Sequence, residues 1–230
     1  MNEHTVTAFD DELNLLISQI AEMGGIAESM IDRSVKALTT ADKELSRKVV
    51  ADDKQLNDLR ETIDEQVVLF IARRQPMASD LREAIGTLRM ATDIERIGDL
   101  GKNIARRTFE IEENLPPKKL MRGLKHLTKA TLEQLKDILD AYATRDIEQA
   151  KQVWERDDEV DNLYNSLFRE MLTYMMEDPR NITYCTHLLF CAKNMERIGD
   201  HVTNLAETII FMVTGSSDIY GGDQASESNT

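Results

Sequence analysis

The feature that most constrains how this chain folds is an internal repeat of about one hundred residues. The pentapeptide ERIGD occupies positions 95–99 and returns unchanged at positions 196–200, 101 residues later. Asn103 and Asn204 match at the same offset. Solenoid repeats have periods of about 20–50 residues, so a spacing of this length indicates a duplicated domain.

An upstream stretch of each copy matches at a slightly different offset. Asp53 and Asn57 correspond to Asp157 and Asp161, 104 residues later. A longer loop around residues 75–80 of the first copy absorbs the difference of three. The match therefore covers two segments of each copy rather than one short motif.

The junction between the copies lies near Asn114–Pro117, because paired prolines interrupt helical structure. We expect one domain over residues 1–114 and a second over residues 115–214. The remaining residues, 215–230, are rich in Gly and Ser and predict a disordered tail.

The composition favours helices throughout both copies. The chain has ten Gly and four Pro in 230 residues, and aromatic residues make up only 5%. We predict an all-α fold of two tandem antiparallel three-helix bundles. Thr40 with Asp42, Ser79 or Asp80, and Thr144 are the candidate N-caps of three of the helices. The six expected helices cover residues 9–38, 42–74, 79–114, 117–143, 144–177 and 181–213.

Apolar residues recur at helical spacing in the middle segment of each copy, and we interpret both stripes as bundle core. Cys185 and Cys191 lie six positions apart on one expected helix, too far to pair with each other, so they are interpreted as reduced core cysteines. The two stripes are Leu56, Leu59, Ile63, Val67 and Phe70, and Val160, Leu163, Leu167, Met171 and Tyr174.

The charge excludes some classes of partner. The formal net charge is −14, and no long Lys/Arg run offers nucleic acid a basic patch. Adsorption to an anionic membrane is disfavoured for the same reason. No apolar run is long enough to span a bilayer, and the acidic N-terminus lacks a signal core, so a cytoplasmic location is expected.

The repeated motif places carboxylates on one helical face. Glu95 and Asp99 are four residues apart, as are Glu196 and Asp200, and the asparagines at 103 and 204 extend each line by one turn. Like charges at this spacing repel each other. A hard cation would compensate them, because Mg²⁺, Mn²⁺, Ca²⁺ and iron favour oxygen ligands.

The neighbouring helix of each hairpin supplies further oxygens. With the first turn centred at residue 77, Asp53 and Asn57 lie at levels that bracket Asp99. With the second turn at Pro179, Asp157 and Asp161 lie near Asp200. Two interpretations remain open on spacing alone: the carboxylates form solvated faces opposite the apolar stripes, or they line surface grooves that bind cations.

Other kinds of site have weaker support in the sequence. It contains no Glu-x-x-His motif of ferritin-like di-iron bundles and no phosphate-cradling Gly loop. No nucleophile has an evident base beside it. We therefore do not expect an enzyme, and the alternative kept open is a metal-dependent enzyme acting on phosphate compounds through its clustered carboxylates. A further alternative is a helical scaffold without metal.

Several segments resemble the PhoU family of bacterial phosphate-signalling regulators. The doubled motif stands in IERIGDLGKNIAR and MERIGDHVTNLAE, and AEMGGIAESM, ARRQPMASDLR and LTYMMEDPR also resemble the family. The resemblance extends from about Leu13 to Val213. It implies a cytoplasmic negative regulator of the phosphate-starvation response and of phosphate uptake. Such proteins couple the ATPase subunit of a phosphate ABC transporter to a phosphate-sensing histidine kinase, and typically form dimers or larger oligomers.

The resemblance also implies metal ions at the two motifs, with Mg, Mn, Fe or Zn as the candidates. Asn57 stands where the second copy has Asp161, so the first site is expected to carry less negative charge. Asn57, Asn103 and Asn204 are possible additional ligands. Nucleic acid is not an expected partner, and a membrane is expected only indirectly. The implied metal residues are Asp53, Glu95, Asp99, Asp157, Asp161, Glu196 and Asp200.

Overall fold

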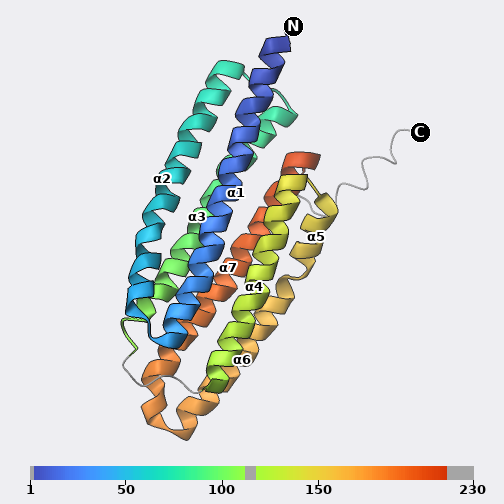
Figure 1. Ribbon diagram of the computed structural model, residues 1–230. Helices are drawn as coiled ribbons and strands as arrows, with labels where there is room; N and C mark the ends of the chain where they lie inside the picture. Colours follow the sequence, from blue (N-terminus) through green and yellow to red (C-terminus); the bar gives the residue numbers. More distant parts are fainter. Residues whose placement is uncertain (1–2, 112–117, 217–230) are drawn as a thin grey trace, which may run out of the picture.

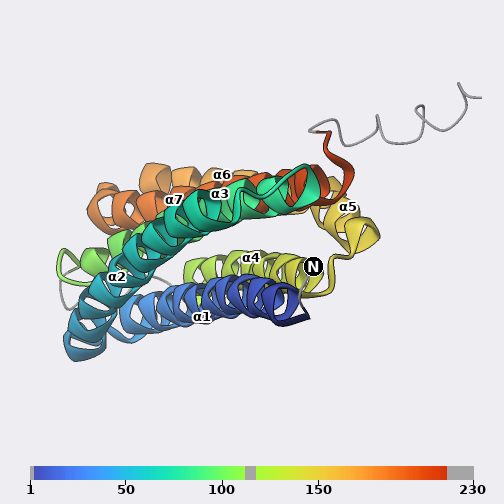
Figure 2. The ribbon, with the colours of Figure 1, turned by 90° about the horizontal axis from the view of Figure 1, so that it is seen from above.

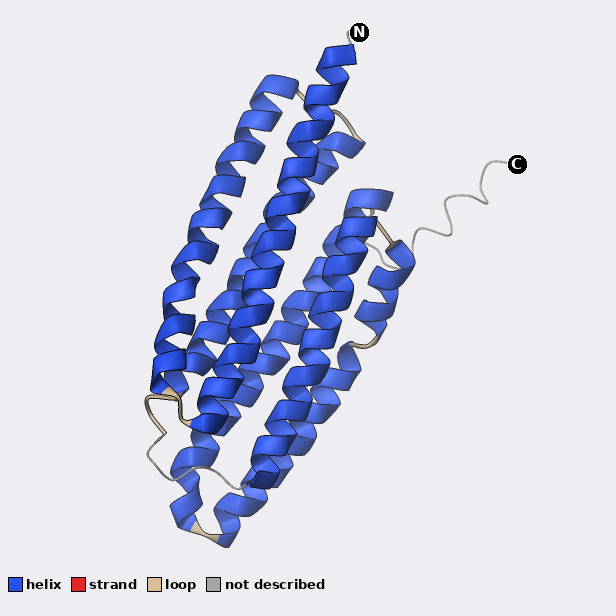
Figure 3. Cartoon of the chain, in the orientation of Figure 1, coloured by secondary structure: helices blue, strands red, loops and turns tan. Residues whose placement is uncertain are grey.

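The computed structural model describes residues 3–111 and 118–216, and its secondary structure within these ranges is helical (Figures 1 and 3). A short 3₁₀ turn, Pro179–Asn181, precedes the last helix. The helices are α1 (Glu3–Thr40), α2 (Lys43–Arg74), α3 (Ser79–Arg107), α4 (Lys118–Thr144), α5 (Ile147–Glu155), α6 (Asp157–Glu177) and α7 (Ile182–Thr214).

The helices form two bundles that lie side by side, α1–α3 and α4–α7 (Figure 1). Helices α3 and α7 pack against each other between the bundles, with α2 beside α3 and α6 beside α7 (Figure 2). Helices α1 and α4 make a second contact between the bundles. One hydrophobic core runs through both repeats. The predicted fold class, two tandem helical bundles, is confirmed.

The expected apolar stripes are bundle core. Leu56, Ile63 and Val67 are fully buried on α2, and Leu167 and Met171 are buried on α6. Both cysteines are buried and unpaired. Burial raises the pKa of the Cys191 thiol to about 12, which makes it a poor nucleophile.

The expected junction near 114–117 and most of the tail at 215–230 fall outside the described residues. Among the helices of residues 3–111 and 118–216, none is both long and apolar enough to cross a membrane.

The structure confirms one expected helix cap and corrects the others. Asp42 caps α2, accepting a hydrogen bond from the Leu45 amide at 2.9 Å, whereas Thr40 is the last residue of α1. Thr144 is instead the last residue of α4, and its hydroxyl donates to a carbonyl of the preceding turn. Asp146 caps α5, because Arg145 first turns the chain with φ of 59°. Helix α3 begins at Ser79, with no side-chain cap.

The segment expected as one helix over 144–177 is two helices, and this prediction was wrong. The helix breaks at Arg156 between α5 and α6. The carbonyl of Arg156 accepts a hydrogen bond from the buried Gln134 side chain at 2.8 Å, and its guanidinium pairs with Asp137 at 2.9 Å. Both partners lie on α4, so a tertiary contact stabilises the break.

The glycine of each ERIGD motif permits close packing within its hairpin. A Cβ atom at Gly98 would collide with the buried Leu56 side chain of α2. A Cβ at Gly199 would lie 3.2 Å from Val160 of α6. The motif therefore brings its own carboxylates close to those of the preceding helix.

Substitution of this glycine tests the close approach. Gly98→Val should lower the free energy of unfolding by about 1–3 kcal/mol, because the added side chain overpacks a closed interface. Gly25→Val is the matched control, since nothing lies within 4 Å of a Cβ at that position. Urea denaturation followed by circular dichroism measures both. Equal stability of the two variants would contradict the close packing at Gly98.

Candidate functional site

The seam between α2 and α3 that carries Asp53 and Asp99 is here called the first groove, and Lys102 lies between those two carboxylates. The matching seam between α6 and α7 is called the second groove. The Lys102 ammonium lies 2.7 Å from Asp53 Oδ2 and 2.5 Å from Asp99 Oδ1. The Lys102 and Asp53 side chains are each only 14% exposed. A charge-assisted hydrogen bond to each helix therefore bridges the hairpin at the level of the motif.

The other residues expected in this groove lie around that bridge. Glu95 is 12% exposed, and its nearest basic partner is Arg96 at 3.5 Å. Asn57 donates from Nδ2 to Asp53 at 3.4 Å. Asn103 is exposed, and its side chain makes no hydrogen bond to another described residue. The structure thus brings Asp53, Asp99 and Asn57 together and leaves Asn103 outside their contacts.

The lysine changes the acidity of its partners. Burial alone would raise the pKa of the Asp99 carboxyl, but the hydrogen bond and charge of Lys102 outweigh it, and that pKa lies below its usual value. Burial likewise opposes the charge on Lys102, yet its two carboxylate partners hold the lysine pKa above its usual value. The pair is therefore ionised at neutral pH.

The second groove, between α6 and α7, has no such lysine. The position equivalent to Lys102 is Thr203, whose hydroxyl donates to Asp157 Oδ1 at 3.0 Å. Lys193 pairs with Glu196, one turn away on the same helix, and not with the aspartates. Asn204 points elsewhere, with its amide 3.5 Å from Asp93 of the first repeat.

The carboxylates of the second groove remain poorly compensated. Burial raises the pKa of Asp161, and the charges of Asp157 and Glu196 raise it further. Asp200 is exposed at one side, and the burial of its other side raises its pKa against the lowering effect of Lys193. Glu196 Oε2 is buried without a hydrogen-bond partner. Excess negative charge and an unsatisfied buried oxygen are features that a cation would relieve.

The grooves differ as candidate metal sites. The second offers carboxylate oxygens from Asp157, Asp161, Glu196 and Asp200, which is the donor chemistry that hard divalent cations prefer. The first offers fewer, and an ammonium already binds two of them. Among the described residues, no three carboxylate, histidine or cysteine side chains are close enough to form a ready-made metal site.

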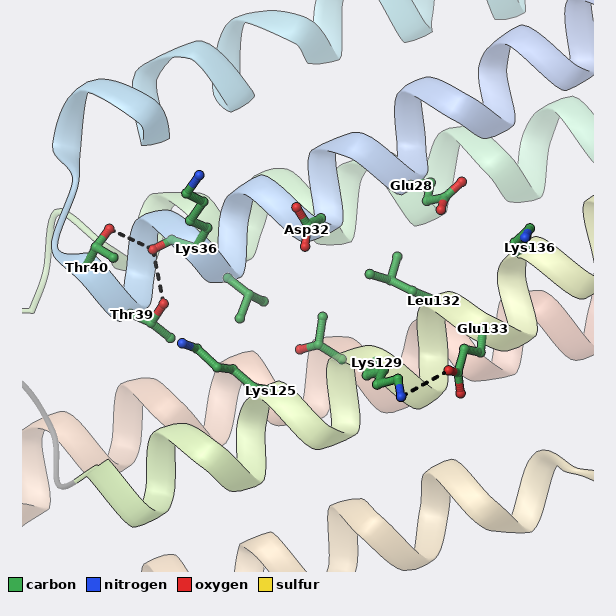
Figure 4. Close-up of a pocket in the computed structure, with 12 residues that line it drawn as sticks. Glu28, Asp32, Lys36, Thr39, Thr40, Lys125, Lys129, Leu132, Glu133 and Lys136 are labelled. Carbon is green, nitrogen blue, oxygen red and sulfur yellow. Dashed lines mark hydrogen bonds and ion pairs between the residues drawn. The ribbon is translucent and has the colours of Figure 1, made fainter.

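A third surface feature is a groove of about 590 Å³ between α1 and α4 (Figure 4). Lysines lie along it among three acidic residues, and Lys129 pairs with Glu133 at 3.5 Å. The Thr39 and Thr40 hydroxyls donate to the Lys36 carbonyl, so their protons are not available to an anionic ligand. Its mixed charge fits a protein segment better than a small anion. The charged side chains are Lys36, Lys125, Lys129, Lys136, Glu28, Asp32 and Glu133.

Sequence reasoning missed the residues that distinguish the two grooves. Lys102 and Thr203 share the offset of 101 with the motif, so the internal alignment could have identified them. It also missed the contact of His201 with Asp93, 2.8 Å apart, which joins α7 to α3. That contact crosses the two repeats, and no local pattern points to it.

A duplicated helical bundle with a carboxylate-lined groove on each repeat is the class of protein that this fold and site define. Comparison with known proteins identifies it further. The family model for the PhoU domain matches residues 20–108 and again residues 124–209. The chain belongs to the PhoU family.

Individual relatives agree with this assignment along nearly the whole chain. The phosphate-specific transport system accessory protein PhoU homolog of Rhizobium meliloti is 57% identical over 213 residues, covering 93% of this chain and 90% of the relative. The phosphate-specific transport system accessory protein PhoU of Escherichia coli is 37% identical, with 97% and 93% covered. The crystal structure of PhoU from Pseudomonas aeruginosa superposes with a TM-score of 0.85 at 38% identity, covering 90% of this chain and all of that one.

The electrostatic difference between the grooves predicts that an Asp→Asn substitution changes the free energy of unfolding in opposite directions in the two grooves. In protein treated with chelator at pH 7, Asp99→Asn should lower the free energy of unfolding by about 0.5–1 kcal/mol, since Lys102 loses a charged partner. Asp200→Asn should raise it by about 0.2–0.5 kcal/mol, since repulsion is relieved. Urea denaturation between pH 3 and 8 measures both.

The pH dependence follows from the direction of each pKa shift. Folding lowers the pKa of Asp99, so the ionised carboxylate stabilises the folded protein. This contribution to the free energy of unfolding is fully present above the ordinary aspartate pKa of about 3.9 and is lost as the pH falls through the lowered pKa. Folding raises the pKa of Asp200, so the ionised carboxylate destabilises the folded protein. This loss of unfolding free energy is present above the raised pKa and disappears as the pH falls towards about 3.9. Effects of the same sign would contradict the assignment.

Proposed function

We propose that this protein is a cytoplasmic negative regulator of the phosphate-starvation response and of phosphate uptake. It acts as an adaptor between the ATPase subunit of a phosphate ABC transporter and a phosphate-sensing histidine kinase. The observation that carries the proposal is family membership over both repeats, together with relatives described as accessory proteins of phosphate-specific transport systems.

The surface of the structure supports a role in binding other proteins. Phe168, Leu172 and Met176 are exposed at successive turns of α6 and form an apolar stripe. The groove between α1 and α4 is a second, mixed-charge surface. The adaptor binds its partners through surfaces of this kind and reaches the membrane only through the transporter. It pairs as a homodimer, and it has no nucleic-acid partner because its charge repels one.

Metal binding is part of the proposal. Asp157, Asp161, Glu196 and Asp200 would hold Mg²⁺, Mn²⁺, iron or Zn²⁺, and the ion would neutralise the charge between α6 and α7. The unsatisfied Glu196 oxygen and the raised pKa values of Asp161 and Asp200 support this assignment. Asp53, Glu95 and Asp99 fit a metal less well, since Lys102 already binds two of them.

Deletion of the gene tests the regulatory role. In cells grown with ample phosphate, loss of a negative regulator should raise the activity of a phosphate-starvation reporter, such as a secreted phosphatase. The wild-type gene supplied from a plasmid should restore low activity. Unchanged reporter output in the deletion strain, with no second copy in the genome, would contradict the proposal.

Direct capture tests the adaptor role separately. Purified protein should bind the transporter ATPase subunit and the cytoplasmic part of the kinase at micromolar concentration. Failure to bind either partner, with or without phosphate and Mn²⁺, would reject the adaptor. Hydrolysis of phosphate esters that disappears in Asp200→Ala protein would support the enzyme alternative instead.

A further inference from the structure

The two hairpins hold their carboxylates in equivalent places but neutralise them differently. In the first, the Lys102 ammonium lies between Asp53 and Asp99, at 2.7 and 2.5 Å. In the second, Thr203 occupies the equivalent position and contacts only Asp157 of the corresponding pair. A hydroxyl carries no charge, so the second pair lacks the counter-ion that the first pair has.

We propose that Lys102 is a built-in counter-ion that takes the place of a metal in the first groove, so that the chain binds divalent metal in its second groove only. The inference rests on the metal binding proposed above. The two repeats then differ in metal binding because Lys102 stands in the first where Thr203 stands in the second.

The position of the ammonium explains why a metal would not displace it. The Lys102 side chain is only 14% exposed, and its hydrogen bonds satisfy one oxygen of each aspartate. A divalent ion between Asp53 and Asp99 would have to expel the ammonium or lie beside it. Expulsion removes two charge-assisted hydrogen bonds, and coexistence places a dication next to a cation in a poorly solvated groove.

The remaining donors of the first groove do not provide a site while Lys102 is in place. Asn57 replaces the carboxylate that Asp161 supplies in the second groove. Glu95 lies 3.5 Å from Arg96, and the positive charges of Arg96 and Arg60 both favour its ionised form. The first groove thus has three carboxylates where the second has four, and the cations Lys102, Arg96 and Arg60 lie close to them.

Lys193 is not the equivalent of Lys102 in the second groove. It is 49% exposed and pairs with Glu196, while its ammonium also lies 5.5 Å from the centre of the Tyr164 ring. The first repeat has Thr92 at the matching position. At this outer position Lys193 makes no ion pair with Asp157, Asp161 or Asp200.

Exchange of the two residues tests the inference. Chelator-treated wild-type protein, Lys102→Thr, Thr203→Lys and the double exchange are each equilibrated with Mn²⁺, and bound metal is measured by elemental analysis. Wild-type protein should bind Mn²⁺. The Thr203→Lys and Asp200→Ala variants should not bind it, and the Asp99→Ala variant should bind as much as wild type. Lys102→Thr should raise bound Mn²⁺ about twofold, since both grooves then offer uncompensated oxygens. Lys48→Thr, which removes an exposed lysine of α2, is the control and should leave the metal content unchanged.

Melting temperatures without metal give a second readout. In chelator, Lys102→Thr should lower Tm by roughly 2–4 °C, and Thr203→Lys should raise Tm, because each changes the number of neutralised carboxylates. Lys48→Thr should change Tm little.

The outcomes separate the two proposals. If Asp99→Ala and Asp200→Ala each bind less Mn²⁺ than wild type but still bind some, both grooves hold metal. That result would overturn the counter-ion inference and leave metal binding standing. Lys102→Thr that gains no metal while wild type binds in the second groove would also overturn it. No Mn²⁺ on any variant would reject metal binding and the inference together. Unchanged melting temperature of Lys102→Thr in chelator would show that the ammonium does not neutralise the aspartates.

Discussion

The antiparallel packing of α3 against α7 is the contact on which the rest of the structure depends. These are the two motif helices, and each is covered by helices of its own repeat and by the other motif helix. His201 meets Asp93 across this contact, and the Arg107 guanidinium lies 4.5 Å from the centre of the Phe190 ring. Because so much of each motif helix is buried, only a narrow strip remains for polar side chains. That strip carries the carboxylates, so both grooves are positioned by the same rigid centre.

Much of the fold could be predicted from the sequence, because the signals are local and occur twice. Helical periodicity located the bundle core, and Asp42 was recognisable as a cap because N-cap chemistry acts within one turn. The break at Arg156 could not be predicted in this way. It depends on Gln134, 22 residues earlier in the chain, whose side-chain amide donates a hydrogen bond to the Arg156 carbonyl. The cap at Asp146 depends similarly on the positive φ of Arg145.

The candidate site was only partly predictable for a related reason. Hairpin geometry placed Asp53 and Asn57 at levels that bracket Asp99, and in the structure Lys102 joins Asp53 to Asp99. Spacing alone suggested that Asn103 would extend the carboxylate line, yet the neighbouring Lys102 reaches into the groove instead. A lysine on a helix usually indicates a solvated face, and its long side chain allows several directions. Which direction it takes is decided by the two aspartates, one of them on another helix.

The difference between the grooves bears on how a metal would act in this protein. Lys102 is part of the chain, so Asp53 and Asp99 have a counter-ion whether or not a cation is supplied. On the proposal above, the second hairpin is neutralised only when a cation is supplied, and the repulsion among its carboxylates returns when the cation leaves. Metal occupancy would therefore act on α6 and α7. Helix α6 also carries the exposed stripe of Phe168, Leu172 and Met176 on its surface. Because α7 is packed against α3, a change in the spacing of this hairpin would move α6 and its apolar surface, and metal would influence partner binding in this way.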